Sequence, residues 1–268
     1  MFDAHIHLHQ YKDIDRQIEQ WQQAGIEGVA AVSTDLRSSY ETLSLKQRYP
    51  DFIFAAIGFH PEQPLPSSRD ITEWENLLRR ERHLISAIGE VGLPYYTLHE
   101  QQHDSLEHYI AFLDEMTCIS KRESLPIILH AVHSHTPIAY DLLIRHHILK
   151  AHFHWLKAAP SVVKQITDSG YYISVTPEAC YRERDQDLIR HVPLKQLLTE
   201  TDGPWPFSGP FQNKATSPVF IEDVIKKIAE VKGKDIMTVQ KQCKQNMLAL
   251  FEPSALNAAG SEENERTI

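Results

Sequence analysis

The sequence predicts an α/β protein with the fold of a single-domain (β/α)8 TIM barrel, and three observations lead to this prediction. The chain has 268 residues, 42% of them hydrophobic, and roughly 250 residues is the usual size of one such barrel. Short apolar runs rich in Val, Ile and Phe recur along the chain, and longer amphipathic stretches separate them. Strands that are apolar on both faces need helices on both sides, so the eight runs predict eight strand–helix units.

These elements follow one another in a regular order. The predicted strands are residues 2–8, 28–33, 53–58, 84–89, 126–130, 150–154, 171–175 and 196–201. The predicted amphipathic helices are residues 15–24, 38–49, 71–81, 103–123, 137–145, 161–168, 185–191, 221–231 and 235–251. Gly25 and Gly170 come shortly before predicted strands, as expected of glycines that end a helix in a left-handed conformation. We therefore expect one barrel domain over residues 1–252.

The tail, the cysteines and the lack of long apolar segments limit the class of protein further. Residues 253–268 have no apolar periodicity and are predicted to form a flexible C-terminal tail. The chain does not begin with a basic segment followed by an apolar one, and it has no run of about 18 apolar residues. These features predict a cytoplasmic protein that does not bind membranes.

The cysteines of the chain are odd in number and far apart, so we expect them to be reduced.

The net charge bears on the choice of partner. A formal charge of −9 argues against an open basic surface that binds nucleic acid by releasing counterions. Lysines do cluster within residues 226–244, but acidic residues are interleaved with them, which is typical of a solvated helix face. A nucleic-acid substrate would therefore need help from bound metal ions. We expect no obligate protein partner.

Histidines and carboxylates stand at the ends of the predicted strands. They are His5, His7, His60, Glu90, His130, His152, His154 and Asp202. Because the carboxyl ends of the strands form the active-site face of a barrel, we expect these side chains to meet there. Imidazole nitrogens and carboxylate oxygens bind zinc, manganese and similar divalent ions. The pattern therefore predicts a metal site.

His5, His7 and Glu90 carry much of this prediction. His5 and His7 are two residues apart, so in a strand both side chains project to one face. Glu90 lies in an apolar segment, where an unpaired carboxylate is costly to bury. Either a metal ion or an ion pair with an arginine would supply the cation that it needs. Gly89 and Gly92 suggest that another backbone approaches closely at this point.

The remaining candidates are ambiguous when each is taken alone. His130 and His154 both end apolar runs, where a hydrogen-bonded core histidine is at least as common as a metal ligand. Asp202 ends the last predicted strand, but Glu200 faces the same side if that strand is regular. Their joint position at the strand ends is what favours a shared metal site.

Five segments together resemble the TatD family of metal-dependent deoxyribonucleases, which belongs to the amidohydrolase-like superfamily of barrels. The segments are Asp3-Ala4-His5-Ile6-His7-Leu8, Gly58-Phe59-His60-Pro61, Gly89-Glu90-Val91-Gly92-Leu93, Pro126-Ile127-Ile128-Leu129-His130 and Glu200-Thr201-Asp202-Gly203-Pro204. They occur in the order found in the family. The resemblance ends at residues 245–251, which are similar to the closing helix of the family.

The resemblance implies a site for two divalent ions, which would be Zn, Mn, Mg or Ni. The implied ligands are His5, His7 and Asp202 on one ion, His130 and His154 on the other, and Glu90 bridging both. His154 is preferred to His152 because its distance in sequence from Gly170 matches the family. His60 is implied to lie beside the substrate rather than on a metal, and Asp202 and His60 are the implied catalytic residues.

The surroundings of the implied site depart from the family. Pro94 stands where the family has Asp, and Ala131-Val132-His133 follows His130 where the family has Ser-Arg. That arginine is expected to contact a substrate phosphate. The segment that follows His154 also differs, since Trp155-Leu156-Lys157-Ala158 replaces Cys-Phe-Ser-Gly. The substrate is therefore open between DNA and a small phosphoester.

The predicted function is hydrolysis of phosphoester bonds, as in a TatD-like deoxyribonuclease, by a water molecule that the metals activate. Asp202 would bind one ion and accept the proton of that water, and His60 would stabilise the developing charge. One alternative is hydrolysis of a C–N or C–O bond in a small molecule at the same site, which the negative charge and the missing arginine favour. Another is a metal-binding protein without turnover, against which the complete set of ligands argues.

Four residues near the strand ends are candidate substrate contacts. His133 and Lys157 could bind an anionic group. Trp155 and Trp205 follow the sixth and eighth predicted strands and could stack on a base or another flat group. For the tryptophans, packing within long loops is an equally good interpretation.

Overall fold

A computed structural model describes residues 1–100 and 104–252 of the chain, and the predicted tail at 253–268 lies outside the described residues. Its parallel strands form one eight-stranded sheet in the order β1 to β8. The strands are β1 Phe2–Ile6, β2 Gly28–Val32, β3 Ile53–Ile57, β4 Ile85–Gly92, β5 Ile127–His130, β6 Ala151–Phe153, β7 Tyr172–Val175 and β8 Leu197–Thr199. The predicted (β/α)8 barrel is confirmed.

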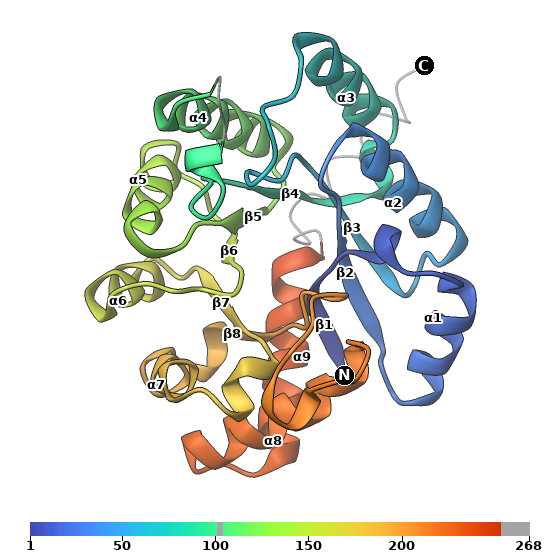
Figure 1. The fold of residues 1–268 in the computed structure, drawn as a ribbon, viewed down its shortest axis with the longest axis vertical. Helices are drawn as coiled ribbons and strands as arrows, with labels where there is room; N and C mark the ends of the chain where they lie inside the picture. Colours follow the sequence, from blue (N-terminus) through green and yellow to red (C-terminus); the bar gives the residue numbers. More distant parts are fainter. Residues whose placement is uncertain (101–103, 253–268) are drawn as a thin grey trace, which may run out of the picture.

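The helices surround the strands, as Figure 1 shows. They are α1 Ile14–Gln23, α2 Leu36–Arg48, α3 Ser68–Arg80, α4 Leu106–Glu123, α5 Thr136–Arg145, α6 Pro160–Asp168, α7 Glu183–His191, α8 Ile221–Lys232 and α9 Ile236–Phe251. Side chains define several of their starts; Asp35, for example, accepts a hydrogen bond from the Ser38 amide at the start of α2. Gly25 and Gly170 have φ values of 85° and 82°, which confirms the left-handed helix ends expected there.

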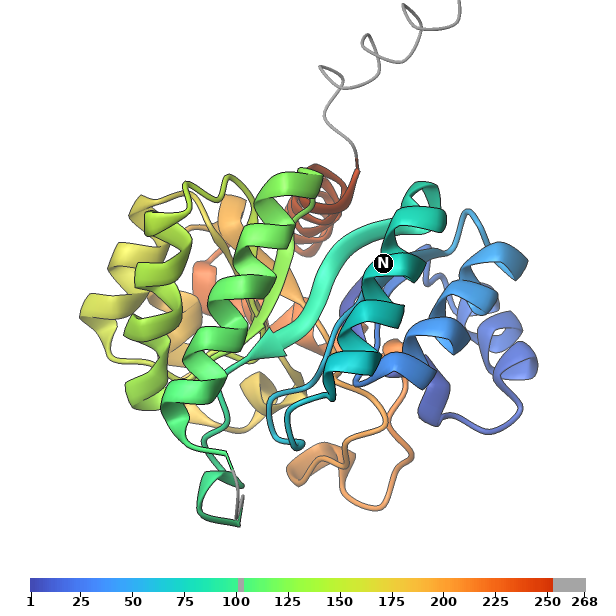
Figure 2. The ribbon, with the colours of Figure 1, turned by 90° about the horizontal axis from the view of Figure 1, so that it is seen from above.

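Helix α9 closes one end of the barrel. Its residues Met247, Leu250 and Phe251 are buried against small inward-facing side chains such as Ala30 and Ala56. Figure 2 shows α9 at the end opposite the loops that follow β4 and β8. These loops therefore form the open mouth. None of the helices in the described ranges is long and apolar enough to cross a membrane.

The sheet closes between β1 and the segment after β8. Ile6 and Gly203 form a parallel bridge, and the amide of Asp202 donates to the carbonyl of His5 at 2.9 Å. The Asp3 carboxylate completes the seam by accepting a hydrogen bond from the Thr201 amide at 3.0 Å. Backbone contacts thus bring Asp202 beside the first strand, about 200 residues away in sequence.

Among the strand boundaries that differ from the prediction, two affect the position of the candidate site. Strand β1 ends at Ile6, so His7 lies just past it, and β4 continues to Gly92. Glu90 is therefore inside a strand rather than beyond its end. The glycines in this stretch of β4 allow β5 to lie very close. A Cβ atom at Gly89 would be 2.7 Å from Ile128 Cβ, and one at Gly92 would be 1.9 Å from the His130 carbonyl oxygen. The close backbone approach that the glycines suggest is present.

Candidate metal centre

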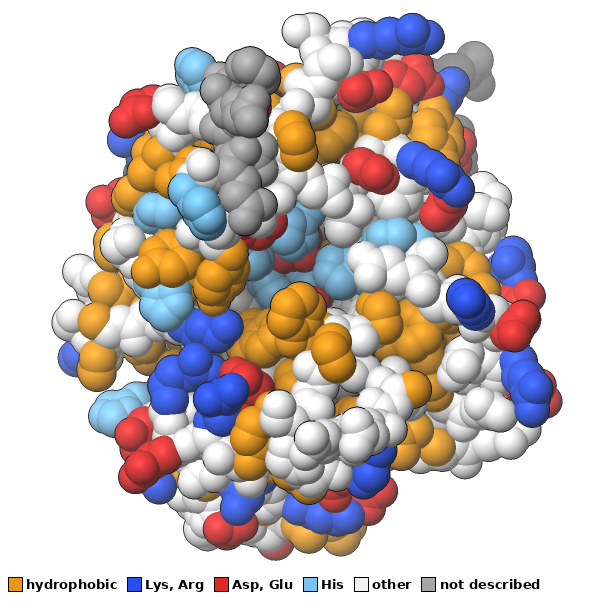
Figure 3. Space-filling model, in the orientation of Figure 1, with side chains coloured by type: hydrophobic (Ala, Val, Ile, Leu, Met, Phe, Trp, Pro, Cys, Tyr) orange, Lys and Arg blue, Asp and Glu red, His pale blue; other side chains and the backbone are white. Residues whose placement is uncertain are grey.

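The predicted ligands meet in a cavity at the mouth of the barrel. This metal-site cavity has a volume of about 850 Å³ and is lined by His7, His60, His130, His154 and Asp202, among others. Figure 3 shows histidine and acidic side chains together in the hollow at the centre of this face. His5 and Glu90 lie beneath it and are fully buried.

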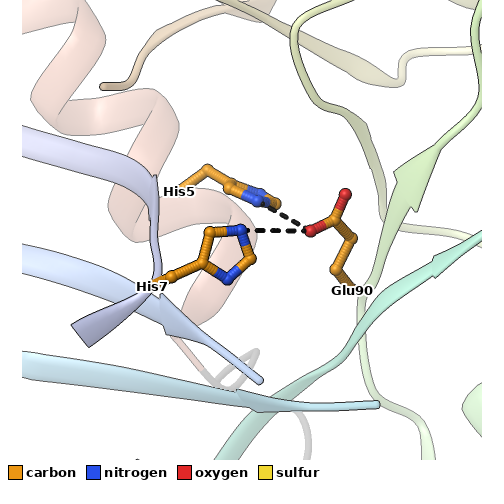
Figure 4. A group of neighbouring side chains, drawn as sticks. All are labelled: His5, His7 and Glu90. Atoms are coloured by element: carbon orange, nitrogen blue, oxygen red, sulfur yellow. Dashed lines mark hydrogen bonds and ion pairs between the residues drawn. The ribbon is translucent and has the colours of Figure 1, made fainter. Parts of the chain in front are cut away.

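One group of potential metal ligands combines side chains from β1 and from the segment after β8 with Glu90 of β4. Glu90 Oε2 lies 3.1 Å from His5 Nε2 and 3.5 Å from His7 Nε2, an arrangement visible in Figure 4. Asp202 Oδ1 is 3.5 Å from the same atom of His5 and 3.3 Å from that of His7. Two ligands of one ion, each about 2.0–2.1 Å from it, are separated by similar distances.

A second group lies on the other side of Glu90. Glu90 Oε1 is 3.0 Å from His130 Nδ1 and 2.8 Å from His154 Nε2, and these two nitrogens are 3.2 Å apart. The two oxygens of Glu90 thus face different groups. Glu90 is thus placed to contribute to both groups.

His60 lies at the edge of the second group. Its Nε2 atom is 3.3 Å from Glu90 Oε1, and its side chain is 19% exposed. It lines the cavity and so can reach both a bound substrate and the second group. The position agrees with the expected place beside a substrate, and it also brings a further nitrogen within reach of an ion.

The electrostatics of Glu90 indicate that the site needs cations. Burial raises the pKa of Glu90, but His60, His154 and His5 outweigh burial and hold this pKa well below its usual value. Burial lowers the pKa of His154, while Glu90 and Glu200 reverse that effect and raise it well above normal. The charge of Glu90 therefore favours the protonated form of His154. Divalent ions can replace such protons, so the donors present fit the implied metals.

His152 and Glu200, the two competing candidates, support the ligands from behind. His152 Nε2 is 2.7 Å from Ser174 Oγ, and this hydroxyl is also 2.7 Å from Glu200 Oε2. Glu200 Oε1 lies 3.5 Å from His154 Nδ1. The structure therefore places Asp202, rather than Glu200, against His5 and His7. Glu200 orients the ring of His154 from the side remote from Glu90.

Glu62 is a cavity residue that the sequence reasoning missed. Its Oε1 atom is 3.2 Å from His130 Nε2 and accepts a hydrogen bond from the Tyr95 amide at 2.8 Å. The Thr97 amide donates to Oε2, also at 2.8 Å. Burial raises the pKa of Glu62, but these donors outweigh burial and lower it below its usual value. An acidic residue two positions after His60 was the available signal.

The predicted substrate contacts fall into two places. Trp155, Trp205 and Lys157 line the metal-site cavity, and the two indole rings are 6.0 Å apart. The Lys157 ammonium lies 4.5 Å from the centre of the Trp155 ring and donates to the Tyr96 hydroxyl at 3.0 Å. Tyr96 was not predicted. His133 instead lines an adjoining cavity, which also contains Lys157.

Comparisons with known proteins show the family of the chain. The family model described as TatD related DNase matches residues 2–252. A protein of Haemophilus influenzae named "Uncharacterized metal-dependent hydrolase" is 38% identical over 242 residues, which cover 90% of this chain and 95% of that protein. The "3'-5' ssDNA/RNA exonuclease TatD" of Erwinia amylovora is 29% identical and covers 94% of this chain and 99% of its own length.

A solved structure has the same fold. The TatD homolog YJJV from Escherichia coli aligns with a TM-score of 0.83 and 24% identity, over 95% of this chain and 98% of that one. The family model spans the whole described barrel, and the relative from Haemophilus influenzae exceeds 30% identity over most of both chains. The chain therefore belongs to the TatD-related DNase family and is a metal-dependent hydrolase.

Proposed function

We propose that this protein hydrolyses phosphoester bonds, in DNA or in a small phosphoester, with two divalent ions at the barrel mouth. The observation that carries the proposal is the convergence of six potential metal ligands, namely Glu90 and five side chains around it. They are His5, His7, Glu90, His130, His154 and Asp202. Two relatives are named for such a reaction: the exonuclease from Erwinia amylovora and the human "Deoxyribonuclease TATDN3".

Each group of donors would hold one ion. His5, His7 and Asp202 would hold the first, His130 and His154 would hold the second, and Glu90 would be shared between them. When bound, the ions lower the pKa of a coordinated water and polarise the phosphoryl oxygen. Their identity is open among Zn, Mn, Mg and Ni.

Asp202 and His60 are the proposed catalytic residues. Burial raises the pKa of Asp202, but its hydrogen bond to His7 and the charge of His5 outweigh burial and lower it. The carboxylate is thus ionised and able to accept a proton from water. His60 lies across the cavity beside Glu90, where it can donate to an oxygen that gains negative charge.

The walls of the cavity suit a substrate with both flat and anionic parts. Trp205 is 58% exposed and offers a stacking surface beside Trp155. Lys157 supplies a positive charge at the rim, next to these rings. His133 is reached through the neighbouring cavity. These four residues are the proposed substrate contacts.

One observation favours hydrolysis of an uncharged C–N or C–O bond as a second candidate. Glu62 places a further carboxylate in the cavity, and an anionic substrate would be repelled by it. Lys157 is the single Lys or Arg that lines this cavity within the described ranges. If the substrate is a phosphoester, the bound ions must compensate the negative charge of Glu62 as well as that of the ligand carboxylates.

A substrate screen separates these candidates. Metal-free protein would be titrated with Mn²⁺ or Zn²⁺ and assayed on a phosphodiester, a single-stranded oligodeoxynucleotide, an amide and a lactone. The proposal predicts metal-dependent turnover of the first two. Turnover confined to the amide or lactone would contradict it and support the alternative. Metal binding without any turnover would support a protein that has lost catalysis.

A further inference from the structure

We infer that the cavity between α6 and α7 is a second substrate subsite, which takes the phosphate next to the scissile one together with an attached sugar or base. This inference rests on the proposed phosphoester hydrolysis. The α6–α7 cavity has a volume of about 560 Å³, which is enough for part of a nucleotide. Its lining includes His133, Lys157, Val163, Arg184 and Leu188.

The α6–α7 cavity adjoins the metal-site cavity through Lys157. This residue lines both cavities, and its carbonyl oxygen accepts a hydrogen bond from the His133 amide at 2.5 Å. The segment after β5 is thereby joined to the segment after β6. In Figure 3 basic side chains gather beside the central hollow. A substrate bound at the metals can therefore continue past Lys157 without leaving the protein surface.

Basic side chains are fixed at this junction by Glu178. The buried carboxylate of Glu178 accepts hydrogen bonds from Arg182 Nε at 2.7 Å and Arg184 Nη2 at 2.8 Å. It also accepts one from the indole of Trp155 at 3.2 Å. One residue thus ties a wall of the metal-site cavity to the start of α7. The arginines are held in place before any substrate binds, which reduces the entropy lost on binding.

Donors remain available on these cations. Arg184 uses Nη2 for its bonds to Glu178 and Asp185, and a guanidinium has five N–H groups. Among the residues that the structure describes, Lys157 donates one hydrogen bond, to Tyr96, and an ammonium has three N–H groups. A phosphate between Lys157 and Arg184 would receive charge-assisted hydrogen bonds from both.

The rest of the cavity shows where the phosphate and its attached group would lie. Leu156, Val163 and Leu188 give it an apolar floor, and Glu183 and Asp187 add acidic groups from α7. Asp187 is paired with Arg190. An anionic group is therefore favoured on the Lys157 side and an apolar, flat group on the floor. A nucleotide has both parts, whereas a simple phosphate ester has only the first.

The test compares a substrate that spans both cavities with one that fills the first. The long substrate is a short single-stranded oligodeoxynucleotide, and the short one is the p-nitrophenyl ester of thymidine 5'-phosphate. Arg184→Gln removes a cation, and Ala159→Phe fills the cavity from its exposed edge. Lys164→Gln is the control, because Lys164 is an exposed residue of α6 that pairs with Asp168.

The two variants should act on the ratio of kcat/KM for the long substrate to kcat/KM for the short one. We expect this ratio to fall about tenfold in Arg184→Gln, as for the loss of one hydrogen bond to a charged group. It should fall also in Ala159→Phe, where the ring occupies the space of the substrate, and stay unchanged in Lys164→Gln. Equal effects on both substrates, or no effect on either, would overturn the second subsite.

A binding measurement keeps the inference separate from the proposed reaction. If the wild type hydrolyses no phosphodiester, the proposed function fails, but the affinity for a fluorescent oligodeoxynucleotide can still be measured by anisotropy. Weaker binding by both variants than by Lys164→Gln would support the subsite. Affinities equal to that of the wild type would overturn it, whatever the catalytic result. Circular dichroism on each variant confirms that it is folded.

Discussion

The two roles proposed for Asp202, metal ligand and base, depend on one backbone position. Its φ of 48° turns the chain sharply after β8, and its amide is anchored on the carbonyl of His5. The carboxylate is consequently held 3.3–3.5 Å from two histidine nitrogens and is still 12% exposed. It can bind an ion and also meet a water molecule in the cavity.

Substitution of Asp202 by Asn should lower kcat by about 10²–10⁴-fold, because the amide cannot accept the proton of the attacking water. Steady-state kinetics on a phosphodiester, with metal content measured on the same sample, would check this. Asp168→Asn is a matched control, since Asp168 is exposed and pairs with Lys164 on the protein surface. A metal-filled Asp202→Asn protein with undiminished kcat would show that Asp202 is not the base.

Glu62 gives a prediction on pH. Its pKa is lowered in the folded protein, so its contribution to stability is fully present above its unfolded pKa of about 4.5 and is lost as the pH falls below that value. Glu62→Gln should reduce the free energy of unfolding of metal-free protein at pH 7 by about 1.5–3 kcal/mol.

The difference between wild type and Glu62→Gln should shrink as the pH is lowered from 5 towards 3, because Glu62 of the unfolded wild type then takes up a proton while the folded form, with its lowered pKa, does not. Urea denaturation at several pH values measures it. Glu19→Gln is a suitable control, since this side chain is exposed on α1. A difference that is constant with pH would mean that Glu62 acts through packing rather than charge.

At the residue scale, the sequence predicts a site residue when a side chain that can bind metal also stands at the end of a predicted strand. His5, His7, His130, His154 and Asp202 stand at strand ends, and the barrel prediction alone brings them to one face. Glu62 and Tyr96 belong to loops after β3 and β4, where the path of the chain depends on long-range hydrogen bonds such as Glu62 to the Tyr95 amide. No local pattern encodes those bonds.

At the scale of elements, β4 is the strand on which the site depends. It carries Glu90 in its interior, and close contact with β5 fixes the distance from Glu90 to His130. That contact requires residues without side chains. The sequence indicated the close approach through Gly89 and Gly92 but not the length of β4, because a register shift between Ile88 and Val91 extends the pairing.

Gly92→Ala should destabilise the protein by about 1–3 kcal/mol or more, since the new Cβ would lie 1.9 Å from the His130 carbonyl oxygen. The ligand His130 should also shift, and metal affinity should fall with stability. Thermal and urea unfolding, together with metal titration, measure both effects.

Gly25→Ala is the matched control for this variant. Gly25 also has a positive φ, of 85°, but a Cβ there would meet nothing within 4 Å. We expect it to lose only the cost of the left-handed conformation, about 1–2 kcal/mol, with metal affinity unchanged. Equal metal affinity in Gly92→Ala and the wild type would refute the role assigned to the β4–β5 contact.

At the scale of the whole molecule, the two ends of the barrel have different tasks. Helix α9 fills the closed end with apolar side chains, and the open end gathers buried histidines and carboxylates that do not contribute an apolar core. The alternation of strands and helices predicts this architecture because it follows from local patterns. Closure between β1 and the segment after β8 is less predictable, since it depends on Asp3, whose side chain replaces a backbone partner.

We propose that the open end of the barrel is one site for two ions that share Glu90. The most direct test is the metal content of purified protein after loading with Mn²⁺ or Zn²⁺, measured for the wild type, Glu90→Gln and His130→Ala. Two ions per chain are predicted in the wild type, with loss of only the second in His130→Ala and weakening of both in Glu90→Gln. Undiminished binding of two ions by Glu90→Gln would contradict the account.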